Sequence, residues 1–299
     1  MSRLVARFLP DGRRLHILDG PIDLIVEAWG TVADVHRALE AAVECARPVL
    51  DDLCAELSAL RAPQPGPAMQ GTVARRMQCA VAPYAARTFI TPMAAVAGAV
   101  AEHVLGAMVA SATLARAYVN NGGDISIHLA PGQTFDVAMA ELGGQGLGSI
   151  RVQSADLVRG IATSGWPGRS YSLGIADSVT VLAATASQAD AAATVIANAV
   201  DLPHHPGVQR VAARALSPDS DLGDRLVTRA VARLSATDRH TALATGAVVA
   251  SDLIRSRLIA AAALYLQGEA MVRAMPSLRA PSDIRIAGTR NYLDFLLQG

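Results

Sequence analysis

The sequence predicts an α+β fold in which antiparallel strands pack against long helices. Residues 13–29 alternate between apolar and polar side chains around a turn at Asp19-Gly20, which is typical of a β-hairpin. Long stretches at 32–60, 91–117 and 241–275 are typical of helices, and short apolar runs lie between them. Strand pairs that alternate with long helices favour an α+β fold with antiparallel pairing.

The N-terminal half is predicted to contain a hairpin, two long helices and a loop. Thr31 and Asp34 resemble a capping box at the start of the first helix, and Pro48 should break or kink it. The run APQPGPAMQG, at 62–71, predicts a surface loop within one domain that spans residues 1–299. Thr91-Pro92 then begins the second long helix, because proline is favoured in a first helical turn.

The remaining elements are predicted from shorter patterns. Residues 117–129 (AYVNNGGDISIHL) are expected to form a strand interrupted by glycines, and another strand is expected at 148–153. An apolar strand at 178–184 leads into a helix at 187–200. Strands at 209–216 and 225–234 flank an acidic loop, and the last long helix occupies 241–275. The sequence shows no internal repeat.

Composition excludes several classes of function. The chain has 26 basic and 26 acidic residues, so neither a nucleic acid nor a membrane is expected as a partner. Aromatic residues make up only 4%, which disfavours a base-stacking platform. All the basic residues are arginine. The absence of lysine excludes Schiff-base chemistry on a lysine and the ordinary P-loop.

Cysteine usage points to a reducing compartment. Cys45, Cys54 and Cys79 form no CxxC motif and cannot all pair, so we expect a cytoplasmic protein. The N-terminus lacks the apolar region of a signal peptide. The most apolar stretch, 92–114, includes Glu102 and His103, which favours a buried helix over a membrane span.

Two glycine-containing segments are candidate ligand sites. In NNGGD, the paired Gly122 and Gly123 would weaken a strand unless a ligand approaches the backbone, and Asp124 would then face that ligand. The alternative is a β-bulge with an exposed aspartate. In ATSG, at 162–165, two small hydroxyl residues can line a phosphate or a ring. An ordinary turn is the alternative there.

Two further segments carry hard oxygen ligands. Ser187 and Asp190 have the spacing of an N-cap and its capping acid. Alternatively, Asp190 and Thr194 share one helix face and offer two oxygen ligands for Mg²⁺. Residues 218–228 contain three aspartates, which predict either a cation site or a solvated turn. The paired histidines at 204–205 are a further candidate for metal binding, with structural roles as the alternative.

An ordered set of motifs resembles an uncharacterised branch of the ApbE-like superfamily. The set is GPIDLIVEAWG, FITPMAAVAGAVAE, VNNGGDISIHL, ATSG, ADSVTVLAA, ADAAAT and PDSDLGDRLVT, and it covers nearly the whole chain. The founding members are FAD:protein FMN transferases with an α+β, T-fold-like architecture. They split FAD with the help of Mg²⁺ and attach FMN to a threonine or serine. The resemblance therefore implies Mg²⁺ and FAD or FMN as cofactors and a small-molecule ligand.

The resemblance also assigns roles to individual residues. It makes Asp190 and Thr194 the metal ligands. It implies a cofactor-binding set of Asn121, Gly122, Gly123, Asp124, Thr163, Ser164 and Gly165. Asp177, in the motif ADSVTVLAA, is an additional acid that joins Asp190 as a candidate catalytic residue.

Three departures from the transferases shape the functional hypotheses. An MGT-type motif is missing, the AKGY segment is replaced by Val96-Ala97-Gly98-Ala99, and residues 170–177 lack the histidine of the family. Flavinyl transfer is therefore not the expected reaction. We favour an enzyme that binds a flavin nucleotide with Mg²⁺. The alternatives are a hydrolase of a small heterocyclic metabolite and a non-catalytic binding module. The apolar helices also allow a homo-oligomer.

Overall fold

A nine-stranded antiparallel sheet forms the centre of the molecule. The computed structural model describes residues 3–140, 146–276 and 284–286. The strand order is β1-β2-β3-β4-β5-β8-β9-β12-β13. The strands are β1 (Val5–Phe8), β2 (Leu15–Asp19), β3 (Ile22–Trp29), β4 (Arg116–Asn121), β5 (Asp124–Leu129), β8 (Gly160–Ser164), β9 (Ser178–Ala183), β12 (Ala261–Leu266) and β13 (Glu269–Ala274). Every neighbouring pair in this sheet is antiparallel, which confirms the predicted α+β class.

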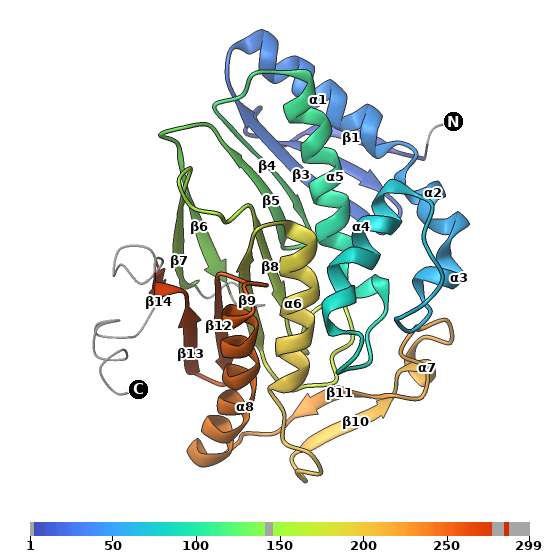
Figure 1. Cartoon of the computed structure of the whole chain (residues 1–299), viewed down its shortest axis with the longest axis vertical. Coiled ribbons are helices and arrows are strands. Elements are labelled where there is room, and N and C mark those ends of the chain that lie inside the picture. The colour runs from blue at the N-terminus through green and yellow to red at the C-terminus, as the bar shows by residue number, and fades with distance from the viewer. Residues whose placement is uncertain (1–2, 141–145, 277–283, 287–299) are drawn as a thin grey trace.

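Long helices cover one face of this sheet, as Figure 1 shows. They are α1 (Val32–Ala46), α4 (Thr72–Val81), α5 (Val96–Ser111), α6 (Ala186–Ala199) and α8 (Ala236–Arg255). Shorter helical segments are α2 (Val49–Ala55), α3 (Leu57–Leu60), η1 (Ala82–Tyr84), η2 (Pro92–Ala95) and α7 (Ala213–Leu216). The main core lies between the helices and the sheet, where Leu24, Val26, Val119 and Val181 are fully buried. Burial of this apolar surface is the main force that holds the two layers together.

Two smaller sheets complete the fold. A three-stranded sheet has the order β14 (Ile284–Ile286), β7 (Gly146–Gln153) and β6 (Thr134–Ala140). A second apolar cluster joins Ile150 and Val152 of β7 to Ile127, Ile161 and Leu182 of the main sheet. The third sheet is the ribbon of β10 (Val208–Ala212) and β11 (Leu226–Val231), at the bottom of Figure 1.

The two halves of the main sheet have the same connectivity. In the first half, the hairpin β2–β3 is followed by helices and then by the hairpin β4–β5. In the second half, the hairpin β8–β9 is followed by helices and then by β12–β13. The halves meet where β5 pairs with β8 and where α5 packs against α6. We call this junction the seam. The topological repeat leaves no visible repeat in the sequence, because only apolar periodicity is needed to form each half.

Several predicted elements are confirmed. The hairpin at 13–29 is β2–β3, and residues 62–71 form the loop between α3 and α4. The Thr31 hydroxyl accepts a hydrogen bond from Asp34 N, as predicted for the N-cap of α1. The Asp34 carboxylate instead accepts from the Thr31 hydroxyl, so the capping box is not reciprocal. Pro48 ends the first helical segment, and α2 begins at the next residue.

Four predictions of secondary structure were wrong in whole or in part. One is the strand predicted at 209–216, because β10 ends at Ala212 and residues 213–216 form the helix α7. Residues 117–129 form the hairpin β4–β5 and not one interrupted strand, because Gly122 and Gly123 both have positive φ, as a tight two-residue turn requires. The helix predicted to reach residue 117 ends at Ser111, where the chain turns into β4. The last helix ends at Arg255, and residues 261–274 form β12–β13. Their alanine-rich sequence favours a helix, but these residues form strands because β12 pairs with β9 and is buried.

One apolar helical stretch in the described ranges, Pro92–Ser111, is long enough to cross a membrane by length and composition. In the fold it packs against α1, α6 and strands β4 and β5. Val100, Val104 and Met108 of α5 are fully buried there. These contacts are those of a core helix, as the sequence predicts.

Candidate functional site

Two carboxylates meet at the seam, one from the sheet and one from a helix. Asp124 is the first residue of β5 and lies opposite Asn121 of β4, which contacts α5. The side chain of Asp124 shares a sheet face with that of Asn121 and therefore faces the helices. Asp124 Oδ1 accepts a hydrogen bond from Thr163 N of β8 at 3.1 Å. Asp190, on α6, accepts a hydrogen bond on Oδ2 from Gly98 N of α5 at 3.0 Å. Each carboxylate thus bridges the two halves of the fold.

The surroundings of both carboxylates disfavour their charged forms. Burial raises the pKa of Asp124 to about 7, although the Thr163 amide opposes this shift. Burial and then the charge of Asp124 raise the pKa of Asp190 well above its ordinary value, against the amides of Gly98 and Ala97. Both residues are half-buried as a whole, whereas their carboxyl groups are deeply enclosed. No cationic side chain contributes to either pKa, so the described residues leave this pair of carboxylates without a counter-charge.

The NNGGD segment forms the turn that carries Asp124. Gly123 N donates to Asn120 Oδ1 at 2.8 Å, which closes the turn. Asn121 is buried, and its Nδ2 donates to Ala97 O at 3.2 Å. Asn121 therefore fixes the β4–β5 turn against the start of α5. The alternative interpretation, a bulge with an exposed aspartate, does not occur, because Asp124 points toward the helix layer.

The TSG segment contributes mainly backbone to the seam. Thr163 uses its amide to bind Asp124, whereas its hydroxyl bonds to Thr180 of β9 at 3.0 Å. Ser164 lies opposite the buried Val179 and shares its face of the sheet. Gly165 is required by packing, since a Cβ there would lie 2.3 Å from Asp177 O. Thr163 and Ser164 belong to β8, so this segment is the end of a strand and not a free turn.

Of the two interpretations of Asp190, that of a capping acid is wrong. The N-cap of α6 is Thr185, whose hydroxyl accepts from Gln188 N. Asp190 lies in the second turn and binds the start of a neighbouring helix instead. Thr194 follows one turn later and is half-buried. Asp190 and Thr194 therefore share a helix face, as their spacing predicts.

A close helix crossing positions Asp190. A Cβ on Gly98 would lie 2.2 Å from Ala186 O, so only glycine lets α5 and α6 approach this closely. One turn along α5, Glu102 accepts from the Ser187 hydroxyl at 2.8 Å and pairs with Arg76 of α4 at 2.7 Å. The sequence reasoning missed Gly98 and Glu102 as site residues. The replacement of the family's AKGY segment by residues 96–99 could have drawn attention to Gly98. The reason why glycine is needed there is visible only in the packing of α5 against α6.

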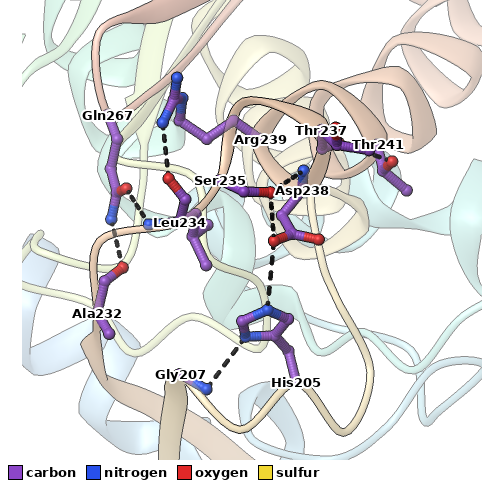
Figure 2. A network of polar contacts seen from close by, with 10 residues as sticks. All are labelled: His205, Gly207, Ala232, Leu234, Ser235, Thr237, Asp238, Arg239, Thr241 and Gln267. Atoms are coloured by element: carbon purple, nitrogen blue, oxygen red, sulfur yellow. Dashed lines mark hydrogen bonds and ion pairs between the residues drawn. The ribbon is translucent and has the colours of Figure 1, made fainter.

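Asp177 is used to hold the fold. Its Oδ1 accepts from Trp166 Nε1 at 3.1 Å, and its Oδ2 accepts from Gln267 N at 2.6 Å. Gln267 begins the β12–β13 turn with a positive φ of 44°. Its side chain also binds Leu234 N and Ala232 O, as Figure 2 shows. These contacts give Asp177 a positioning role, and its predicted catalytic role stays a prediction.

The other acid and histidine candidates are dispersed. Figure 2 shows that His205 accepts from Gly207 N and contacts Asp238, the third residue of α8. Asp221 accepts from the Thr91 hydroxyl, and Asp224 pairs with Arg214. Within the described ranges, no cluster of three or more histidine, cysteine, aspartate or glutamate side chains could hold a metal ion.

The donor set at the seam fits a hard divalent cation that is shared with a ligand. Mg²⁺ typically uses one or two carboxylates and completes its shell with water and substrate phosphate. Asp124 and Asp190 supply two carboxylates, and a cation between them would offset the burial that disfavours their charged forms and the charge of Asp124 that helps to raise the pKa of Asp190. A cavity of about 70 Å³ lies elsewhere, beside the start of α4, and is lined by Asp52, Leu53, Gly71, Thr72, Val73, Ala74 and His103. It includes none of the predicted site residues.

Comparison with models of known families shows to which family the chain belongs. The model of the family described as "AbpE bacteria" matches residues 6–272. The chain belongs to this family. The resemblance to an ApbE-like branch is thereby confirmed, and the match includes every predicted site residue.

Curated relatives and solved structures with similarity to this chain include the following proteins. A UPF0280 protein of Methanopyrus kandleri is 37% identical over 129 residues, which is 42% of this chain and 48% of the relative. A UPF0280 protein of Archaeoglobus fulgidus is 38% identical over 112 residues, which is 37% of this chain and 45% of the relative. The aligned part is thus about half the length of these relatives. The apo flavinyl transferase ApbE of Pseudomonas stutzeri superposes with a TM-score of 0.39 at 11% identity, over 92% of this chain and 94% of that one.

Proposed function

We propose that this chain is an enzyme that binds a phosphorylated heterocyclic ligand of the flavin-nucleotide kind, with a divalent cation, at the seam. The observation that carries the proposal is the facing pair Asp124 and Asp190. Two buried, charged carboxylates without a counter-charge destabilise the folded state unless a proton or a cation is shared between them. Family membership supports a flavin-like ligand.

The chain's own residues have separate tasks in this proposal. Asp190 and Thr194 would hold the cation, and Asp124 would face it from the sheet. The bound cation would neutralise charge on the ligand's phosphate oxygens. Gly98 N keeps Asp190 oriented through the bond to Oδ2, and Asn121 keeps the turn that bears Asp124 against α5. We place this enzyme in the cytoplasm, in keeping with its three free cysteines.

A thermal-unfolding titration with Mg²⁺, alone and with FAD, FMN or AMP, tests the proposal. The free energy of unfolding should rise with Mg²⁺ for the wild type, by about 2.7 kcal/mol when the cation is at 100 times its Kd. Asp190→Asn keeps the shape and the acceptor for Gly98 N but removes the charge, so this rise should vanish. Thr194→Val should weaken the rise less, because it removes a neutral oxygen.

The matched control is Asp219→Asn. Asp219 is exposed in the loop after α7. Its variant should respond to Mg²⁺ like the wild type. Without Mg²⁺, at pH 8, Asp190→Asn should be at least as stable as the wild type, because it removes the repulsion from Asp124. An Asp190→Asn protein that Mg²⁺ stabilises as much as the wild type would refute the proposed cation site.

A further inference from the structure

Arg169 lies beside the glycine turn of the candidate site and is not used by the fold. An ideal Cβ placed on Gly122 would lie 3.6 Å from Arg169 Nη1, so the guanidinium borders the turn that precedes Asp124. The Arg169 side chain is exposed, and it forms no hydrogen bond or ion pair with any residue in the described ranges. The positions around Gly123 are open, with no atom within 4 Å of a Cβ placed there.

The segment that carries Arg169 is fastened at both ends. It connects β8 to β9. On its first side, Trp166 N donates to Ala176 O at 2.9 Å, and the Trp166 indole binds Asp177. On its second side, Asn198 Oδ1 of α6 accepts from Leu173 N at 2.9 Å. The guanidinium therefore extends from a short anchored loop, which limits the range of positions that it can reach.

The charges at the seam are separated and unpaired. Among the residues that the structure describes, Asp124 accepts from the Thr163 amide and Asp190 from the Gly98 amide, and neither carboxylate forms an ion pair with Arg169. A ligand that satisfies both groups must present negative oxygens to Arg169 and, through a cation, to the carboxylates. Phosphoryl and pyrophosphoryl groups have this character, and the planar fork of arginine binds two of their oxygens at once.

We propose that Arg169 binds a phosphoryl or pyrophosphoryl group of the ligand and so selects phosphorylated ligands over their neutral counterparts. The inference rests on the proposed function, because it uses the same turn and the same pair of carboxylates. It adds a residue outside the motifs that define the site, and it names the part of the ligand that this residue contacts.

The test is isothermal titration of the full chain with inorganic pyrophosphate, at constant free Mg²⁺ and ionic strength. Arg169→Gln should weaken pyrophosphate binding by at least about tenfold, in line with the loss of a charged hydrogen bond. Arg169→Lys should lie between Arg169→Gln and the wild type, since it keeps the charge but loses the fork. Arg7→Gln is the control, because Arg7 is equally exposed on β1 at the far edge of the sheet.

Titration with Mg²⁺ alone separates this inference from the proposed function. If Arg169→Gln keeps the Mg²⁺ affinity of the wild type and loses pyrophosphate affinity, the inference is supported. Equal pyrophosphate affinity in Arg169→Gln, Arg7→Gln and the wild type would overturn it, and so would a wild type that binds no pyrophosphate. Loss of Mg²⁺ binding in Asp190→Asn decides the cation site independently of these results.

Discussion

Replacing Gly98 with alanine tests whether the crossing of α5 and α6 holds Asp190 in place. A Cβ at residue 98 would lie 2.2 Å from Ala186 O and 2.9 Å from Ser187 N. Atoms in ordinary contact with carbon lie about 3.5 Å away, so the first turn of α6 would have to move by about 1 Å. Because the contacted atoms are backbone, no side-chain rotation can relieve the overlap.

The size of the effect follows from two opposing terms. Overpacking of a rigid contact costs up to about 3 kcal/mol, and the better helix propensity of alanine returns at most about 1 kcal/mol. Gly98→Ala should therefore lower the free energy of unfolding by about 2 kcal/mol. Gly106 lies on the same helix with no atom within 4 Å of its Cβ position, so Gly106→Ala should raise it by about 0.8 kcal/mol.

Urea unfolding followed by far-ultraviolet circular dichroism measures both variants. The predicted difference between them is about 3 kcal/mol, which corresponds to about 5 °C in Tm for a chain of this length. Gly98→Ala should also lose stabilisation by Mg²⁺ while it is still folded, because Gly98 N would no longer reach Asp190. Equal stability of the two alanine variants would show that the close crossing does not constrain the site.

Three further predictions follow from the same contacts. Because the pKa of Asp124 is raised to about 7, the folded chain holds a proton that the unfolded chain releases near pH 4. The free energy of unfolding should therefore fall as pH rises from about 4 to 7, and Asp124→Asn should flatten this slope in a series of urea titrations. Asp177→Ala should lower the free energy of unfolding by about 2 to 4 kcal/mol and shift Trp166 fluorescence, because two hydrogen bonds to a carboxylate are lost. A decrease equal to that caused by Asp219→Ala would contradict the positioning role. Incubation with FAD, Mg²⁺ and a threonine-bearing target should give a weak fluorescent band in a gel or none, because residues 170–177 lack the family histidine. A strong band would disprove this.

The sequence by itself determined the fold class, the family and some of the residues that meet at the seam, among them Asp124 and Asp190. Local patterns were enough where the structure is local. The Asp19-Gly20 turn predicted the β2–β3 hairpin, Thr31 predicted the N-cap of α1, and Pro48 predicted the break that follows α1. The order of the motifs placed Asp124 and Asp190 in the same predicted ligand site. Their spacing in the sequence did not show that their side chains would face each other.

Only the tertiary structure decided how these residues are used. Asp190 has the spacing of a capping acid, yet Thr185 caps α6 and Asp190 binds the amide of Gly98, 92 positions earlier in the chain. Thr163 supplies an amide and not its hydroxyl, because strand alternation turns the hydroxyl to the other face. Contacts between distant segments set these roles, and no local pattern encodes them.

The same reason explains the secondary structure that sequence analysis misassigned. Residues 261–266 read AAALYL, which favours a helix by propensity, yet they pair with β9 on one side and β13 on the other. The glycines at 98 and 165 look permissive in the sequence, but each allows two backbones to approach more closely than a Cβ would permit. Side chains and turns are specified locally. Pairing partners, close approaches and the pKa values of Asp124 and Asp190 depend on which distant atoms surround them.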